Sequence, residues 1–309
     1  MSETVGTSGS PAASSGPSSR GRRGGRGRGR GGGRGRGRGR VRPITVPRSS
    51  ENPSENGHHV GLQQRISTFT QALLASDPVI PGLDQTVIIP PRRLHLTLGV
   101  MSLDRPSSSE QSQSSQRPKT LESAKALLDE LKPRVMEILA GEKLRVGLKR
   151  VDIMRPDRGD LERAHVMWVG PSHEDEDAKR LKKVSNFLSE EFKKAGLIID
   201  DKRPLKLHTT IVNTIYRKPR GKGRTPFSYA AIIASEAFRA VERPPEAAAA
   251  VIVSEMNVST SSTREKTRGR APLHVDFGDW DVDEIQICEM GSHGPEGEYV
   301  CVGKISLRS

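Results

Sequence analysis

The stretch RLHLTL, from Arg93 to Leu98, returns further along the chain as KLHTTI, from Lys206 to Ile211. Each copy consists of a basic residue, leucine, histidine, a variable residue, threonine and an aliphatic residue, and each continues into residues that favour β-strands. Side chains alternate between the two faces of a strand. The pattern therefore predicts two strands, each with a cation, a histidine and a threonine on one face and aliphatic side chains on the other.

The polar faces of the two strands hold six side chains: Arg93, His95 and Thr97 in the first copy, and Lys206, His208 and Thr210 in the second. If the strands come together, two imidazoles and two hydroxyls line one cleft, with two cations at its edge. Imidazole titrates near neutral pH and serves as a general acid or base. One ring can deprotonate a nucleophile while the other protonates the leaving oxygen of a phosphodiester, and threonine hydroxyls can donate to its non-bridging oxygens. The histidines and threonines are predicted to be catalytic, and the two cations to bind substrate.

Structural roles are the alternative for these residues. A single histidine beside a threonine on a strand is common, but two copies with matching flanks favour catalysis, while the two cations could equally end a strand in solvent. The basic loop Arg217–Arg224 is expected to be solvated, with substrate contact as the alternative. The sequence lacks clusters of ligands at zinc-site spacing, so no metal and no other cofactor is expected. The remaining histidines are expected at the surface or in structural roles: His58, His59, His165, His173, His274 and His293.

Positive charge is concentrated at the start of the chain. The formal net charge is +13, but residues 1–42 hold eleven arginines against one acid, so the rest of the chain is nearly neutral. Residues 20–40 contain only arginine and glycine, which cannot bury apolar surface, and are expected to be disordered. Guanidinium groups bind phosphates and stack on bases. Residues 1–42 are therefore predicted to be a disordered RGG-type RNA-binding tail, with a solubilising or nuclear-targeting tail as the alternative.

The rest of the chain, residues 43–309, is predicted to be one domain in which helices and strands interleave. Apolar residues at helical spacing predict helices over 60–75, 120–139, 177–196 and 229–241. Besides the motif copies, β-prone runs predict strands over 44–46, 143–154 and 164–170, and polar insertions lie at about 104–118 and 242–272. The long apolar runs of a doubly wound parallel sheet are missing. We therefore expect two pseudo-symmetric α+β lobes, each contributing one motif strand.

The chain ends in a predicted β-hairpin, DEIQICEM from Asp283 and YVCVGKISL from Tyr299, which turns near Gly294. A symmetric turn places Cys288 and Cys301 opposite one another, within disulfide range. With only two cysteines, no secretory signal pattern and no apolar run of roughly 18 residues, a soluble intracellular protein is expected. In that environment the two cysteines are expected to remain free thiols.

The motif copies and their flanks resemble the 2H phosphoesterase superfamily of LigT-like and 2′-5′ RNA ligase-like proteins, which is named for its paired HxT/S motifs. The matching stretches are RLHLTLGVM at 93–101, AGLIIDDKRPLKLHTTIVNTIYRK at 195–218 and DEIQICEM at 283–290, and the likeness covers about residues 58–309. Within the superfamily, the flanks are most similar to domains of a transcription-cointegrator complex subunit and of a kinase-anchoring protein.

This resemblance implies a bilobal, pseudo-symmetric α+β fold in which two antiparallel sheets flank a central cleft, with helices outside. It also implies metal-independent phosphodiester chemistry on RNA or nucleotides, with His95, Thr97, His208 and Thr210 as the catalytic residues. From the cointegrator relative, the expected location is the nucleus, with the cytoplasm as an additional location. The expected partners are RNA or nucleotide phosphodiesters and subunits of a nuclear cointegrator or repair complex, and no membrane partner is expected.

Two functional hypotheses follow. The first is a hydrolase, a metal-independent phosphodiesterase that acts on RNA ends, 2′,3′-cyclic phosphates or 2′-5′ linkages. The second is a nuclear scaffold subunit of a transcription-coactivator or repair complex that binds RNA or nucleotide with little or no turnover. The intact set of two histidines and two threonines favours the enzyme, because a pure binding protein does not need paired proton-transfer groups.

Overall fold

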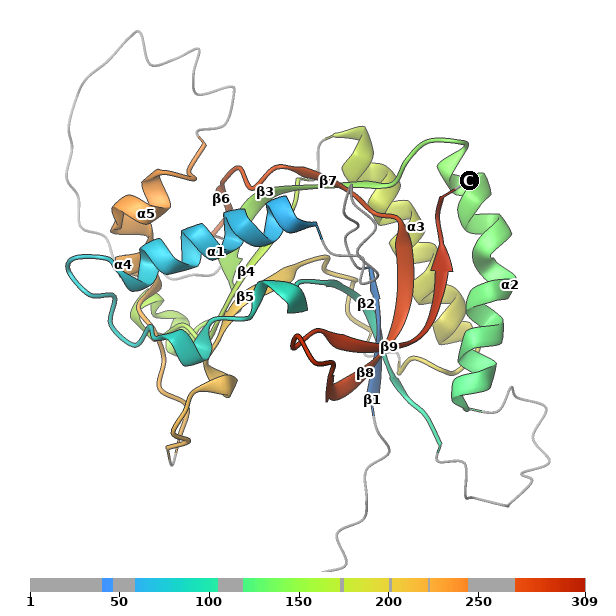
Figure 1. Ribbon diagram of the computed structural model, residues 1–309, viewed down its shortest axis with the longest axis horizontal. Helices are drawn as coiled ribbons and strands as arrows, with labels where there is room; N and C mark the ends of the chain where they lie inside the picture. Colours follow the sequence, from blue (N-terminus) through green and yellow to red (C-terminus); the bar gives the residue numbers. More distant parts are fainter. Residues whose placement is uncertain are drawn as a thin grey trace, which may run out of the picture. The chain divides into compact units, whose positions relative to one another are not determined.

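The computed structural model describes residues 41–46, 59–104, 119–172, 175–199, 202–221, 223–243 and 270–308. The arginine-glycine segment and most of both polar insertions lie outside these residues, so the predictions about them stay predictions. In the described part of the chain, helices and strands interleave as expected (Figure 1). None of the helices described is long and apolar enough to span a membrane.

The first sheet pairs strands from both ends of the domain. Its strand order is β2-β1-β8-β9, and every neighbouring pair is antiparallel. The bounds are Val41–Val46 for β1, Leu96–Ser102 for β2, Glu284–His293 for β8 and Tyr299–Ser306 for β9. β1 pairs on both sides and starts at Val41, so it is longer and more central than the strand predicted over 44–46. The sequence predicted too short a strand because Pro43, which has no N–H to donate, argues against a central strand.

The second sheet is built from the middle of the chain. Its strand order is β5-β4-β3-β6, β7 also pairs with β3, and all pairs are antiparallel. The bounds are Arg145–Ile153 for β3, Val166–Pro171 for β4, Thr209–Asn213 for β5, Leu273–His274 for β6 and Asp279–Asp281 for β7. Two antiparallel sheets with helices confirm the predicted α+β class. One motif copy leads into each sheet, through β2 and β5.

Two long helices, α2 (Leu121–Leu139) and α3 (Glu176–Lys194), pack against each other and lie side by side in Figure 1. α2 begins at a capping box on Thr120, and α3 begins at Asp175, whose carboxylate accepts a backbone N–H of the first turn. Beyond α3, Gly196 adopts a φ of 70°, the left-handed conformation that ends many helices. α2 contacts β9, and α3 contacts β2 and β3, so this pair reaches both sheets.

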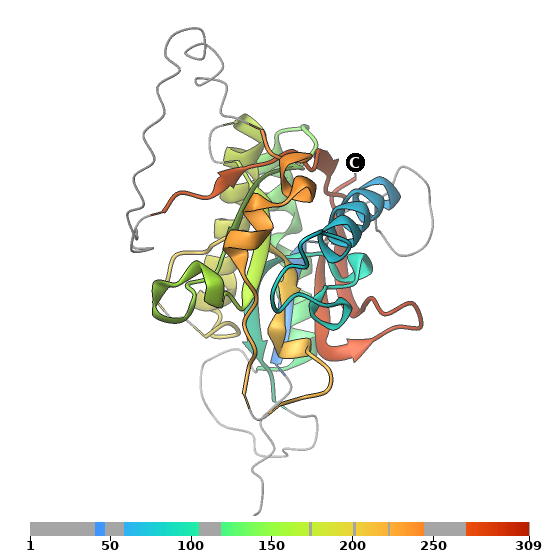
Figure 2. The same ribbon diagram turned by 90° about the vertical axis from the view of Figure 1, so that its left-hand side faces the viewer.

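The remaining helices are α1 (Val60–Leu74), α4 (Tyr229–Ala234) and α5 (Glu236–Arg239). α1 and α5 are in contact and lie close together in Figure 2. The helix predicted over 229–241 is thus two helices, because the Ser235 hydroxyl accepts a backbone N–H of α5 and caps a new start. Five 3-10 turns complete the described elements: η1 (Gln85–Val87), η2 (Pro91–Arg93), η3 (Asp157–Gly159), η4 (Leu161–Arg163) and η5 (Thr214–Tyr216).

Two hydrogen bonds join the chain segments beside the motif strands. The Ile89 N–H donates to the Ile211 carbonyl at 2.9 Å, and the Thr209 hydroxyl donates to the His95 carbonyl at 3.0 Å. Around this junction, one hydrophobic core includes residues of both sheets. Each fully buried aliphatic side chain in it contributes roughly 1.5–3 kcal/mol. The fold therefore holds the start of β2 beside the start of β5.

Candidate active site

Both motif copies lie where an irregular segment enters a strand. β2 begins at Leu96 and β5 at Thr209, so each histidine comes one residue before its strand, and Arg93 ends the 3-10 turn η2. The strands are therefore shorter than the sequence predicted. Pro90 and Pro91 explain the first case, because proline has no N–H for a strand ladder and favours the first position of a helical turn.

The predicted alternation of faces holds in both copies. The four residues predicted to be catalytic are all half-buried: His95, Thr97, His208 and Thr210. The residue between each pair is fully buried, with Leu96 and Thr209 both at 0% exposure. The side chains that could meet a substrate are thus separated from those that anchor the strands.

The two histidines are held in the same way. Nδ1 of His95 donates to the Arg93 carbonyl at 2.7 Å, and Nδ1 of His208 donates to the Lys206 carbonyl, also at 2.7 Å. A carbonyl oxygen can only accept, so both rings carry their proton on Nδ1 in the neutral form. This tautomer leaves Nε2 of each ring as the atom for proton exchange. The repeat in sequence is therefore a repeat in geometry.

The two motif copies also touch. The hydroxyl of Thr209, the residue after His208, donates to the carbonyl of His95. Thr209 is a fully buried residue, so the donor of this hydrogen bond is shielded from water. The fold brings the two histidine-bearing segments into direct contact, as the enzyme hypothesis requires.

Each imidazole also faces the edge or face of an aromatic ring from another strand. His95 lies 5.0 Å from Tyr299 of β9, at an interplanar angle of 84°, and His208 lies 6.1 Å from Trp168 of β4, at 73°. The Lys206 ammonium sits 4.2 Å above the same Trp168 ring, a cation–π contact. Trp168 also pairs with Thr210 in the β4–β5 register.

The protonation of His208 is biased toward the neutral form. Burial lowers its pKa below the usual value, the nearby Lys206 ammonium lowers it further, and the hydrogen bond to the Lys206 carbonyl opposes both effects. Burial likewise lowers the pKa of Lys206, with Asp152 acting in the opposite direction. A neutral imidazole with a lone pair on Nε2 is suited to accept a proton.

The C-terminal hairpin supplies side chains that the sequence did not point to. Arg93 Nε donates to the Gly297 carbonyl at 2.6 Å in the turn between β8 and β9. His293 lies 5.4 Å from Tyr299, and burial together with Arg93 lowers its pKa. Burial and the neighbouring Tyr216 phenol raise the pKa of Tyr299 to about 12, so it stays protonated. A contact between residues some 200 positions apart leaves no local signal in the sequence.

Several other predicted residues have structural partners. His165 contacts Thr214 at 2.9 Å and Asp157 at 3.0 Å, and buried His59 donates to the Asp281 carbonyl at 2.9 Å. His274 is exposed, whereas residues 58 and 173 lie outside the described part of the chain. No group of three or more histidine, cysteine or carboxylate residues suited to a metal ion occurs among the described residues.

The basic loop Arg217–Arg224 is solvated along most of its described length, as predicted, because residues 218–221, 223 and 224 are exposed. Its two end arginines nevertheless bond to the domain. Arg217 pairs with Asp84 and donates to the Gly82 carbonyl at 2.5 Å. Arg224 donates to Thr214 at 3.2 Å and to Asn213 at 3.0 Å. These two arginines hold the ends of the loop against neighbouring turns through a carboxylate, a carbonyl, a hydroxyl and an amide oxygen.

The two cysteines lie opposite one another in the β8–β9 register, as predicted from the position of the turn. The thiol of Cys288 is buried and lies 3.5 Å from the Gln286 side-chain oxygen, while that of exposed Cys301 lies 3.4 Å from the Gly303 carbonyl. Their chemical state in the cell stays a prediction.

Comparison with known proteins places the chain in a family. The model of the family described as AKAP7 2'5' RNA ligase-like domain matches residues 58–307. The chain therefore belongs to this family, within the 2H phosphoesterase superfamily.

Individual relatives are more distant. Activating signal cointegrator 1 complex subunit 1 of Mus musculus is 27% identical over 168 residues, which cover 54% of this chain but only 43% of that relative. The solved structure of E. coli LigT complexed with 3′-AMP is 12% identical with a TM-score of 0.39, and the match covers 88% of this chain and 99% of LigT. TT0787 of Thermus thermophilus is 16% identical with a TM-score of 0.39, with coverages of 87% and 98%.

Proposed function

We propose that the chain is a phosphodiesterase that uses His95 and His208 as its proton-transfer pair and needs no metal for the chemical step. The observation that carries this proposal is the matched attachment of the two rings, each with Nδ1 donating at 2.7 Å to the carbonyl two residues earlier. With Nδ1 bonded to a carbonyl, Nε2 of each ring is left to accept or give a proton, as a general base and a general acid require. The family match supports a phosphodiester substrate.

The reaction is a displacement at phosphorus on an RNA end, a 2′,3′-cyclic phosphate or a 2′-5′ linkage. Neutral His208 takes a proton from the attacking water as the new phosphorus–oxygen bond forms. Protonated His95 gives its proton to the departing ribose oxygen as the old bond breaks. The lowered pKa of His208 favours this assignment of base and acid. Both imidazoles then exchange one proton with solvent and return to their starting forms.

The remaining predicted site residues stabilise negative charge on the phosphate and do not transfer protons. The Thr97 and Thr210 hydroxyls donate hydrogen bonds to the non-bridging oxygens, where negative charge grows in the transition state. Arg93 and Lys206 add positive potential at the two sides of the site. The Tyr299 phenol beside His95, protonated throughout the neutral range, is a further donor in reach of substrate.

A panel of oligonucleotides that end in 3′-hydroxyl, 3′-phosphate or 2′,3′-cyclic phosphate, with 3′-5′ or 2′-5′ linkages, tests this proposal. Mass analysis of the products is expected to show cleavage of at least one class by the wild-type protein. His274→Ala serves as the matched control, because His274 is exposed and lies outside the motif copies. Equal activity in His208→Ala and His274→Ala would contradict the proposed role.

The scaffold hypothesis is the second candidate, and its support is the relative that is named as a subunit of a cointegrator complex. On this hypothesis the chain sits in the nucleus with cointegrator or repair subunits and binds RNA or nucleotide without turnover. The product panel separates the two candidates, because tight binding with no product formed from any oligonucleotide would favour the scaffold.

The arginine-glycine tail is proposed as a second RNA contact under either hypothesis. A variant that lacks the tail should begin at Val41, because β1 begins there and is needed to keep the first sheet whole. The deletion removes most of the net charge of +13, so RNA affinity should fall and its dependence on salt should weaken. An unchanged affinity and salt dependence would refute an RNA-binding role for the tail.

A further inference from the structure

Residues 294–298 form the turn between β8 and β9, which is called the hairpin tip below. The Gly294 N–H donates to the Glu298 carbonyl at 2.9 Å, and the Gly297 N–H donates to the Gly294 carbonyl at 3.0 Å. Gly297 adopts a φ of 85°, a conformation that glycine reaches without strain. These bonds within the turn fix the shape of the hairpin tip.

Two neighbouring arginines clasp the hairpin tip to the 3-10 turn η2. The Arg92 guanidinium pairs with the Glu296 carboxylate, and Arg93 Nε donates to the Gly297 carbonyl at 2.6 Å. Arg93 is also the residue whose carbonyl accepts the hydrogen bond from Nδ1 of His95. One residue therefore joins the hairpin tip to the imidazole that is proposed to act as the general acid.

The residue that follows the hairpin tip meets the same imidazole. Tyr299 begins β9, and its ring lies 5.0 Å from the His95 ring at an interplanar angle of 84°. His293, the partner of Tyr299 in the β8–β9 register, lies 5.4 Å from the Tyr299 ring. The hairpin tip therefore governs both neighbours that hold the His95 ring, Tyr299 directly and Arg93 through the clasp.

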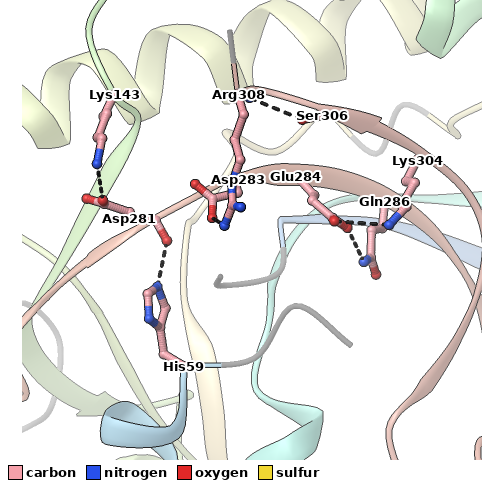
Figure 3. Close-up of polar contacts among 9 residues, drawn as sticks. All are labelled: His59, Lys143, Asp281, Asp283, Glu284, Gln286, Lys304, Ser306 and Arg308. Atoms are coloured by element: carbon pink, nitrogen blue, oxygen red, sulfur yellow. Dashed lines mark hydrogen bonds and ion pairs between the residues drawn. The ribbon is translucent and has the colours of Figure 1, made fainter. Parts of the chain in front are cut away.

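The opposite end of the hairpin is anchored by separate ion pairs. The Lys304 ammonium lies 3.0 Å from the Glu284 carboxylate across the two strands, and Arg308 bonds to Asp283 (Figure 3). Lys304 follows Tyr299 by five residues along β9, roughly 16 Å at the usual rise per residue of a strand. The pair between Lys304 and Glu284 is a matched control for the clasp, because both pairs are partly exposed.

The clasp matters more for geometry than for stability. An ion pair as exposed as that between Arg92 and Glu296 adds little to the stability of a fold. Proton donation is more sensitive, because a general acid has to lie within hydrogen-bond reach of the departing oxygen. A misplacement of about 1 Å can lower a rate about 100-fold. A contact with a small weight in folding can thus have a larger weight in catalysis.

We infer that the hairpin tip positions the His95 imidazole for proton donation, and that Glu296 is a positioning residue for this step. In the described part of the chain, the Glu296 carboxylate bonds to Arg92 and not to a motif residue. It acts by holding the hairpin tip on η2, which keeps the Tyr299 ring against His95. The inference rests on the proposed phosphodiesterase function, in which His95 protonates the departing ribose oxygen.

The test compares two substrates with different leaving groups: an oligonucleotide that the product panel shows to be cleaved, and the para-nitrophenyl ester of a nucleoside 3′-phosphate. As water attacks phosphorus, a departing ribose oxygen needs a proton from the acid, whereas para-nitrophenolate leaves as a stable anion and needs none. Glu296→Arg should lower kcat for the oligonucleotide about two- to fivefold with KM unchanged, and should leave the nitrophenyl ester unaffected. His95→Ala should show the same selectivity with a larger loss. A merely structural defect would slow both substrates.

Two further variants make the result specific. The charge swap, Arg92→Glu with Glu296→Arg, restores the ion pair and should return kcat for the oligonucleotide to the wild-type value. Lys304→Gln breaks the pair at the opposite end of the hairpin and should leave both rates unchanged. The inference would be overturned by equal losses on both substrates in Glu296→Arg, by no loss on either, or by a charge swap that restores nothing.

A measurement without turnover keeps the inference separate from the proposed function. The NMR signals of the His95 imidazole, assigned by their loss in His95→Ala, report the surroundings of the ring directly. They should shift in Glu296→Arg, return in the charge swap and stay unchanged in Lys304→Gln. If the wild-type protein cleaves neither substrate, the proposed function fails and these shifts still support the clasp. A His95 signal that does not move in Glu296→Arg would overturn it.

Discussion

The two copies of the motif are alike in how they hold the histidine and different in what surrounds it. His95 and His208 make the same 2.7 Å bond to a preceding carbonyl. The first ring, however, lies against a tyrosine from the C-terminal hairpin, whereas the second lies against Trp168 with a lysine above it. Shared geometry fixes the tautomer in both copies, and the unlike surroundings can separate the two pKa values. Such a separation is what divides an acid from a base.

The largest effect is expected from removal of the rings themselves. His95→Ala and His208→Ala should each lower kcat about 10²–10⁴-fold, because each removes one proton transfer. The double variant should be little worse than either single variant, since the two residues act as a unit. Steady-state rates of the three variants check this. Losses that simply multiply in the double variant would show that the copies act independently.

A smaller effect on activity should distinguish Thr210 from its neighbour Thr209, because the two side chains lie on opposite faces of the strand. Thr210→Val removes a donor from the half-buried face and should lower kcat about tenfold or more, with little change in stability. Thr209→Val removes the hydrogen bond from a buried hydroxyl to the His95 carbonyl and should cost about 1 kcal/mol in the free energy of unfolding. Urea unfolding and kinetics on both variants measure the two effects. If the Thr210 variant lost only stability, the assignment of the two faces would be wrong.

A shift in pH dependence should follow from the charge beside His208. A base works only when it is neutral, so activity falls on the acid side as pH drops through its pKa. Because the Lys206 ammonium lowers the pKa of His208, Lys206→Met should raise that pKa and move the acid limb of kcat/KM to higher pH. Lys183→Met, on α3, is the control and should leave the limb in place. If the acid limb of the kcat/KM profile stayed unchanged or moved to lower pH in Lys206→Met, His208 would not be the general base.

The smallest effect is expected at the two cysteines of the hairpin. Although Cys288 and Cys301 are opposed, they should titrate as two free thiols after denaturation of freshly purified protein. Serine at both positions should leave catalysis intact, because both cysteines lie outside the motif copies and serine keeps a small side chain at each position. Loss of activity in the folded double variant would show that the hairpin does more than carry Tyr299.

The sequence predicts the repeated part of the site and misses the part that is not repeated. The histidines and threonines stand out because one local pattern occurs twice. Trp168 and Tyr299 come from other strands, and only the sheet register and the path of the hairpin bring them to the rings. In the fold, the same limit applies to β1, whose central position depends on pairing with strands far along the chain and is obscured by Pro43.

The most direct test of the central claim is the pH profile of kcat/KM on an RNA trinucleotide that ends in a 2′,3′-cyclic phosphate, measured with a metal chelator present. The account predicts a bell-shaped profile for the wild-type protein, with one limb for a neutral imidazole and one for a protonated imidazole. It also predicts that His208→Ala lowers the activity about 10²–10⁴-fold across the range. Turnover that requires an added divalent metal, or a rate in His208→Ala equal to that of the wild type, would contradict the claim that the two motif copies form one acid–base pair.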